Sequence, residues 1–261
     1  MDQSKLRELA IQLFDLKALK FYVCKTKAGT KSYIYYDYEV IISNPDIMST
    51  VSDLLTECMK LNMVDMEVHL CGASYMALPV ASLMSAETKK PILIRKDYKT
   101  SGMEKAIEGK FSTGSKSLII ADVVTSGISV VGTAKALRAE GLVVQDAIAI
   151  VDQEQGGRKN AEKYGIRMHS LLTLSFLLNT LRDAGRINES TALAVSKYAE
   201  ATQLRLDLDK RDATTLEIPD DKDSEPCSAF EYIPYFVIVV CSIVWICLCY
   251  RWRMINDQEH I

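Results

Sequence analysis

The order of apolar and polar residues predicts strands and helices that alternate along most of the chain. Apolar runs at 68–71, 92–94, 118–120 and 147–151 are typical of strands that are buried on both faces. Apolar residues recur at helical spacing in segments at 6–19, 45–63, 75–86 and 130–137, and a β-rich run stands at 32–37. This alternation predicts an α/β fold with a mostly parallel, doubly wound sheet, whose ligands bind at the carboxyl ends of the strands.

One segment, SLIIADVVTSGIS at 117–129, joins such a strand to such a helix. Asp122 stands at the end of the apolar run, and a turn of hydroxyl residues and glycine follows. The turn and the start of the helix supply Thr125, Ser126, Gly127 and Ser129. Free N–H groups and the helix dipole attract an anion there, and glycine lets the backbone approach it closely. An ordinary strand–helix turn has the same pattern, but a carboxylate that can hold sugar hydroxyls favours a sugar-phosphate site.

The C-terminal region departs from this pattern. Residues 207–231 are acidic and contain Pro and Ser, which is typical of a flexible tether. Residues 232–250 form a run of 19 residues without a charge, and a helix of that length spans roughly 28 Å, close to the ~30 Å of a bilayer core. A buried core helix is the alternative, but such helices rarely lack a polar face over this length. The run therefore predicts a single transmembrane helix, followed by a short tail at 251–261.

The orientation of this span follows from two opposing signals. Arg251 and Arg253 would keep the C-terminal tail in the cytosol by the positive-inside rule. The N-terminus, however, contains no apolar signal region that would carry a domain across the membrane. We therefore expect a C-terminal tail anchor with the domain, residues 1–206, facing the cytosol.

Composition narrows the possible functions. The 261 residues are 48% hydrophobic and 25% charged, which allows a globular α/β domain of about 200 residues and a further segment. A net charge of −3 gives no indication of a nucleic-acid partner. The seven cysteines have no zinc-binding spacing, so reduced thiols in a cytosolic domain are expected and no metal ligand is assigned.

The 117–129 segment resembles the ribose-5-phosphate signature of type I phosphoribosyltransferases. Four further segments, in the same order along the chain, resemble those of orotate phosphoribosyltransferases, including the N-terminal domain of animal UMP synthases. They are KAGTKSYIYYD at 27–37, GASYMALP at 72–79, RKDYKTSG at 95–102 with EG at 108–109, and DQEQGG at 152–157. The resemblance covers about residues 5–200 and implies the type I phosphoribosyltransferase fold.

The resemblance implies transfer of phosphoribose from phosphoribosyl pyrophosphate (PRPP) to orotate, giving orotidine 5′-phosphate and pyrophosphate, with Mg²⁺ as cofactor. It also implies a homodimer in which a mobile loop at 95–109 reaches the partner's site. The implied catalytic residues are Asp122, Lys96 and Lys99. The implied PRPP and phosphate ligands are Thr125, Ser126, Gly127, Ser129, Arg95 and Tyr75. The implied base-binding residues are Lys27, Tyr35, Tyr36 and Gln153. Without the resemblance, the basic residues at 95–105 would be expected to form a solvated loop.

Three positions depart from the family pattern. Ala121 replaces the first acid of the ribose pair, Ser101 replaces a His or Tyr of the mobile loop, and Gln153 replaces an arginine that would meet orotate. Loss of a charge-assisted hydrogen bond of that kind costs about 1.5–3 kcal/mol. Two hypotheses follow: a membrane-tethered orotate phosphoribosyltransferase with reduced efficiency, or a non-catalytic relative that binds PRPP or a nucleotide and acts as a regulatory or interaction module.

Overall fold

The computed structural model describes residues 1–21, 24–25, 31–62, 67–96 and 106–208. Its central sheet consists of β5 (Val68–Gly72), β6 (Ile92–Arg95), β7 (Ile107–Glu108), β8 (Lys116–Val124), β9 (Val143–Asp152) and β10 (Arg167–Thr173). The strand order is β10-β9-β8-β5-β6-β7, and only β7 pairs antiparallel to its neighbour. The predicted mostly parallel α/β sheet is therefore confirmed.

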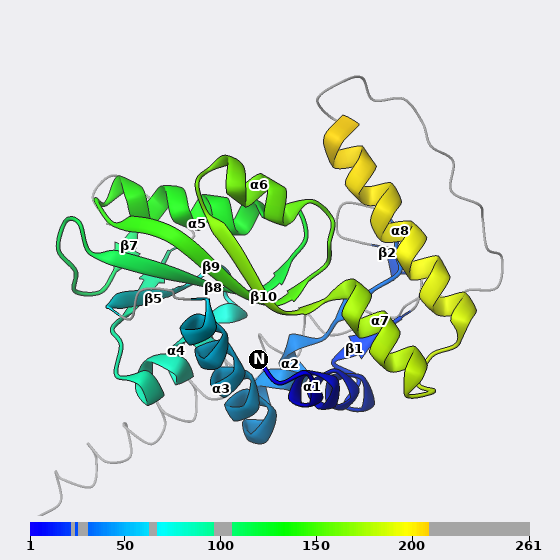
Figure 1. Cartoon of the computed structure of the whole chain (residues 1–261). Helices are drawn as coiled ribbons and strands as arrows, with labels where there is room; N and C mark the ends of the chain where they lie inside the picture. The colour runs from blue at the N-terminus through cyan, green and yellow to red at the C-terminus, as the bar shows by residue number, and fades with distance from the viewer. Residues whose placement is uncertain (22–23, 26–30, 63–66, 97–105, 209–261) are drawn as a thin grey trace, which may run out of the picture.

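Helices cover both faces of this sheet (Figure 1). The helices α3 (Pro45–Leu61) and α4 (Ala77–Thr88) pack on one face, and α5 (Ile128–Ala139) and α6 (Gly157–Lys163) on the other. Beyond the β10 edge lie α1 (Gln3–Asp15), α7 (Leu174–Asp183) and α8 (Glu189–Leu208). The remaining elements are the short α2 (Tyr38–Ile42) and two small antiparallel pairs: β1 (Leu19–Lys20) with β4 (Tyr35–Tyr36), and β2 (Cys24–Lys25) with β3 (Lys31–Ser32).

The central strand β8 explains why the sheet forms two cores. Leu118 and Ile120 are fully buried in the cluster that contains the α3 and α4 side chains. Ile119, between them, is fully buried in the second cluster with Val130 and Leu137 of α5. Successive residues of a strand point to opposite faces, so an uninterrupted apolar run places side chains in both cores. The phosphate-loop segment therefore begins in a strand that is buried on both faces.

Two predicted elements differ from the structure. The helix predicted at 6–19 ends at Asp15, because Lys17 adopts a left-handed backbone conformation with φ of 61° and the chain then enters β1. The single strand predicted at 32–37 is two strands, β3 and β4, which pair with different partners, β2 and β1. The sequence pattern did not predict the strand β10 or the helix α7.

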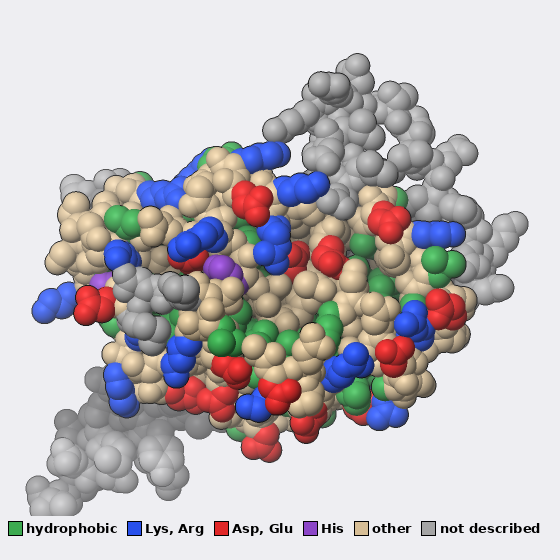
Figure 2. Space-filling view, viewed as in Figure 1, with side chains coloured by type: hydrophobic (Ala, Val, Ile, Leu, Met, Phe, Trp, Pro, Cys, Tyr) green, Lys and Arg blue, Asp and Glu red, His purple; other side chains and the backbone are tan. Residues whose placement is uncertain are grey.

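The helix α8 ends the described part of the chain at Leu208. None of the helices within residues 1–208, apart from the gaps given above, is both long and apolar enough to span a bilayer. The span predicted at 232–250 and the tail at 251–261 lie outside the described residues, as does the predicted tether from residue 209 onward. On the face shown in Figure 2, acidic and basic side chains are interspersed.

Candidate active site

The predicted phosphate loop connects β8 to α5 at the carboxyl edge of the sheet. Gly127 is the N-cap of α5 and has φ of 74°, a left-handed conformation that glycine adopts without strain. It has no side chain that could accept hydrogen bonds from the first-turn N–H groups, so those groups remain donors for an anion. Thr125 and Ser129 are exposed on either side of it. The loop therefore has the geometry expected of a phosphate site.

A second glycine, Gly157, packs against the backbone of this loop. A Cβ on Gly157 would overlap Val124 and lie 2.5 Å from the Thr125 carbonyl oxygen, so only glycine fits. Asn160 of α6 donates from Nδ2 to the Ser126 carbonyl oxygen at 2.9 Å. The start of α6 thus packs directly against the backbone of the phosphate loop, which fixes its shape. Sequence reasoning placed Gly157 in a family segment but did not identify this role, and it missed Asn160.

Asp122 lies beside the loop that follows β5. Ser74 of that loop donates from Oγ to Asp122 Oδ1 at 3.0 Å, and its Oγ accepts from the Ala77 N–H at 3.1 Å. Ser74 therefore fixes one carboxylate oxygen and the start of α4 together; sequence reasoning did not assign it to the site. Tyr75, the next residue, is 77% exposed. Ala121 is 2% exposed within the apolar cluster under α5, where the family pattern has an acid.

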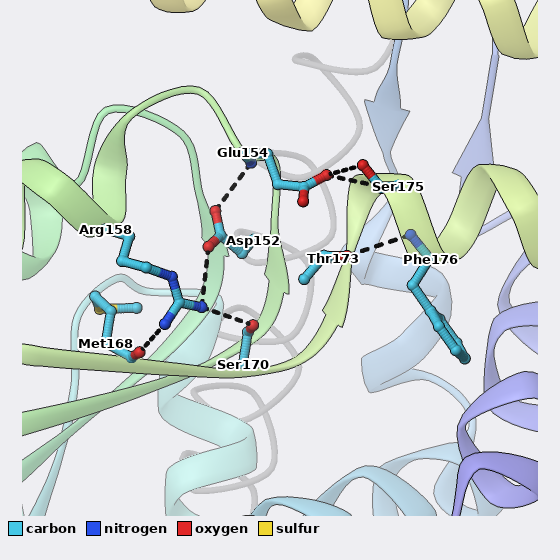
Figure 3. Close-up of polar contacts among 8 residues, drawn as sticks. All are labelled: Asp152, Glu154, Arg158, Met168, Ser170, Thr173, Ser175 and Phe176. Carbon is cyan, nitrogen blue, oxygen red and sulfur yellow. Dashed lines mark hydrogen bonds and ion pairs between the residues drawn. The ribbon is translucent and has the colours of Figure 1, made fainter.

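The segment after β9 contains the predicted base residue Gln153, which is 8% exposed. Its neighbours are held by polar contacts (Figure 3). Asp152 accepts from the Glu154 N–H at 2.9 Å and from Arg158 at 3.3 Å, and Arg158 also donates to the Met168 carbonyl oxygen. These contacts fix both ends of the segment around Gln153.

Glu154 joins this segment to the start of α7. Its Oε2 accepts from Ser175 N at 2.7 Å and from Ser175 Oγ at 2.6 Å, while Thr173 Oγ1 caps the helix by accepting from Phe176 N (Figure 3). Glu154 has φ of 56°, which costs a residue with a Cβ about 1–2 kcal/mol. The two hydrogen bonds hold it in that conformation, so its carboxylate has a structural role.

The predicted base-binding tyrosines differ in environment. Tyr35 is 39% exposed, and Lys20 Nζ lies 5.4 Å from its ring centre. Tyr36 packs against the core, and its ring stacks on that of Tyr38 with centres 6.1 Å apart and planes at 17°. Burial raises the pKa of the Tyr36 phenol, and the carboxylates of Asp152 and Glu154 raise that pKa further. Sequence reasoning did not single out Tyr38, whose ring stacks on the predicted base-binding residue Tyr36.

Burial also raises the pKa of the Tyr38 phenol well above its ordinary value, and the nearby Asp122 carboxylate adds to this. Within the described residues, the hydroxyls of Tyr36 and Tyr38 are buried and have no hydrogen-bond partner. Each such orphaned group costs about 1–3 kcal/mol of stability. The two tyrosines line a small cavity whose other walls are apolar, formed by Leu13, Ala18, Leu19, Ile41, Ile150, Val151 and Leu177.

Two of the predicted cationic residues, Arg95 and Lys96, lie at the end of β6. Arg95 donates to Thr133 Oγ1 of α5 at 2.8 Å, and Lys96 forms an ion pair with Glu108. Lys27, Lys99 and Ser101 lie outside the described residues, so their predicted roles stay predictions.

The described residues offer few ligands to a Mg²⁺ ion. Across the described ranges no three His, Cys, Asp or Glu side chains gather as a metal site. Asp122 offers a single carboxylate, and Mg²⁺ commonly binds through one carboxylate, water and substrate phosphates. The residues therefore fit a cation that is carried mainly by a diphosphate ligand.

The chain is similar in sequence and in fold to known proteins. It is 40% identical over 196 residues to uridine 5′-monophosphate synthase of Bos taurus, covering 75% of this chain and 41% of that protein. It is 33% identical over 199 residues to orotate phosphoribosyltransferase of Chlamydia felis, covering 95% of that protein. The structure of Leishmania donovani UMP synthase superposes with a TM-score of 0.66 at 28% identity, over 75% of this chain and 42% of that one.

The chain spans about two fifths of the length of the UMP synthases that it matches. No family model matches it.

Proposed function

Because the chain belongs to the orotate phosphoribosyltransferase family, as its 33% identity over 95% of the Chlamydia felis enzyme shows, we propose that it transfers phosphoribose from PRPP to orotate. The observation that carries this proposal is the shared carboxyl edge of β5, β8 and β9. There the phosphate loop, the Ser74–Asp122 pair and the Gln153 segment lie on neighbouring strands. These three parts correspond to the phosphate, the ribose and the base of the product, orotidine 5′-phosphate.

In the proposed reaction, the bond between ribose C1′ and the pyrophosphate oxygen breaks, and a bond from C1′ to the orotate ring nitrogen forms. The transition state has oxocarbenium character, so the site must hold the ribose and exclude water. The α5 N-terminus binds the 5′-phosphate, and the Asp122 carboxylate accepts from the ribose hydroxyls. Bound Mg²⁺ supplies charge neutralisation to the pyrophosphate. Arg95, Lys96 and Lys99 are proposed to add positive charge on the same side.

A specific observation supports a second function. Ala121 is enclosed in an apolar cluster, and Gln153 supplies a neutral amide where the family pattern has a cation. These two positions weaken the ribose and base contacts but leave the phosphate loop complete. A protein of this kind could bind PRPP or a nucleotide without catalysing transfer.

A direct assay separates the two functions. The purified full-length chain is given Mg²⁺, PRPP and orotate, and orotidine 5′-phosphate is measured, with PRPP binding followed by calorimetry. We expect product, and we expect Asp122→Asn to lower kcat/KM for PRPP by about 10- to 100-fold, since a charge-assisted hydrogen bond contributes about 1.5–3 kcal/mol. PRPP binding without product at high enzyme concentration would support the non-catalytic function.

We also propose a location and an assembly. The uncharged run at 232–250 forms a single-pass tail anchor, and the domain faces the cytosol. The family resemblance supports a homodimer in which the loop at 95–109 reaches the partner's site. The strands β6 and β7, which precede and follow residues 97–105 in the chain, pair at one edge of the central sheet.

A further inference from the structure

Thr133 is a fully buried hydroxyl residue on an otherwise apolar face of α5. It lies in the second turn of the helix with 0% exposure, and the inward-facing residues around it, Val130, Ala134 and Leu137, belong to the apolar cluster under α5. Valine would fill the same space without a polar atom, and burying a hydroxyl is unfavourable unless it forms hydrogen bonds. Packing alone therefore does not account for the threonine, and the contacts of its hydroxyl indicate another role.

The Thr133 hydroxyl joins α5 to the ends of two strands. Its Oγ1 accepts a hydrogen bond from Arg95 Nη1 at 2.8 Å and donates to the Ala73 carbonyl oxygen at 3.4 Å. Arg95 ends β6, and Ala73 directly follows β5. Because the hydroxyl proton is directed at the Ala73 carbonyl, the oxygen presents its lone pairs to the guanidinium of Arg95.

The surface of α5 also admits the Arg95 side chain. Gly132 precedes Thr133, and a Cβ on Gly132 would lie 3.4 Å from Arg95 Nη1, so the guanidinium lies close against the helix. A guanidinium holds its five N–H donors in one plane, so a short hydrogen bond at Nη1 restricts the directions of the others. The Thr133 contact therefore orients a positive charge that is predicted to bind PRPP.

Resting on the proposed function, we infer that Thr133 is a positioning residue for the diphosphate of PRPP. It does not touch the ligand, but it holds the Arg95 guanidinium in the place from which that group binds the diphosphate. The N–H donors for the 5′-phosphate lie at the start of α5 and do not depend on this hydroxyl. Loss of the hydroxyl should therefore weaken pyrophosphate binding and leave ribose 5-phosphate binding unchanged.

The test uses the full-length chain, with inorganic pyrophosphate and Mg²⁺ as one probe and ribose 5-phosphate as the other. Calorimetry measures both dissociation constants for the wild type, Thr133→Val and Thr133→Ser. Valine should raise Kd for pyrophosphate about fivefold or more and leave Kd for ribose 5-phosphate within about twofold. Serine keeps the hydroxyl and should keep both constants near the wild-type values. Thr133→Ala, with a better helix former, gives the same comparison if valine prevents folding.

A double-mutant cycle shows whether Thr133 acts through Arg95. In an Arg95→Ala background, Thr133→Val should change Kd for pyrophosphate by less than about twofold, because the group that it positions is gone. Thr180→Val is the matched control, since Thr180 is also buried, with 3% exposure, but lies on α7. It should change neither constant.

The outcomes separate this inference from the proposed function. If the wild type binds neither probe, the proposed function fails and the inference fails with it. If the wild type binds both, an unchanged pyrophosphate affinity in Thr133→Val shows that the inference alone is wrong. Equal loss of both affinities with a lower melting temperature would show a purely structural role, which also overturns it. So would an undiminished effect of Thr133→Val in the Arg95→Ala background.

Discussion

Gln153 is the residue at which this site departs most clearly from its family pattern. Its side chain is 8% exposed, and its backbone N–H donates to the Val124 carbonyl oxygen at 2.9 Å, so the position itself is well fixed. Asp152 and Glu154 flank it, and both carboxylates already accept hydrogen bonds. An arginine at this position would therefore meet negative charge that could offset its burial.

The first prediction is that Gln153→Arg lowers KM for orotate. A charge-assisted hydrogen bond to the orotate carboxylate contributes about 1.5–3 kcal/mol, so KM should fall about 10-fold or more, with KM for PRPP unchanged. Steady-state kinetics with each substrate varied in turn measures both constants. Gln153→Met, which is similar in size and uncharged, is the control. An equal decrease with methionine would show that charge is not the cause.

At the scale of elements, the phosphate loop depends on its neighbour. The loop after β8 and the start of α6 touch backbone to backbone, because Gly127 and Gly157 have no side chains to separate them. Asn160 adds a hydrogen bond across the same contact. Helix α7 is tied to this assembly through Ser175 and Glu154 (Figure 3). The helices α6 and α7 thus hold the loops at the carboxyl ends of β8 and β9.

The second prediction is that Gly157→Ala disrupts phosphate binding. The added Cβ would overlap Val124 and the Thr125 carbonyl, so the loop must move, at a cost of about 1–3 kcal/mol in unfolding free energy. We expect a lower midpoint in urea and at least a tenfold rise in Kd for ribose 5-phosphate.

Gly165→Ala provides the comparison, because Gly165 has φ of 66° but open space around its Cβ position. It should lower stability by about 1 kcal/mol through backbone strain and leave the phosphate affinity unchanged. Equal loss of phosphate affinity in both variants would mean that general destabilisation, not loop displacement, is responsible.

At the scale of the whole molecule, the proposed anchor at 232–250 would attach the phosphoribosyltransferase-like domain, residues 1–206, to a membrane. The described part of the chain ends with α8 at Leu208, on the side of β10 away from β5 and β6 (Figure 1). The active-site loops lie at the carboxyl edge of the sheet, and the segment that follows α8 is acidic through residue 231. Residues 209–231 therefore separate the last described helix from the proposed anchor along the sequence.

The third prediction is that deletion of residues 232–261 releases the protein from membranes without loss of activity. The full-length chain should stay in the pellet after carbonate extraction, as an integral span does, and the truncated chain should appear in the supernatant with the same kcat. Residues 232–261 fused to a soluble fluorescent protein are the control and should carry it to the membrane. A soluble full-length chain would contradict the anchor.

The sequence by itself determined the alternating α/β architecture and the phosphate loop. Both are encoded locally: an uninterrupted apolar run such as 118–120 must be buried on two faces, and a Thr-Ser-Gly turn before a helix exposes N–H donors. Family segments in order along the chain then indicated the reaction. The β10 strand escaped detection because it is an edge strand, in which Arg167, His169 and Ser170 interrupt the apolar run that marks strands buried on both faces.

Only the tertiary structure decided which polar groups meet. Ser74 and Asp122 are 48 positions apart and share a hydrogen bond because β5 and β8 are neighbours in the sheet. Tyr38, which no sequence pattern singled out, has a buried hydroxyl that lacks a hydrogen-bond partner among the described residues. No local pattern encodes such proximities, since the packing of whole elements creates them, and packing also determines which donors are left for a ligand.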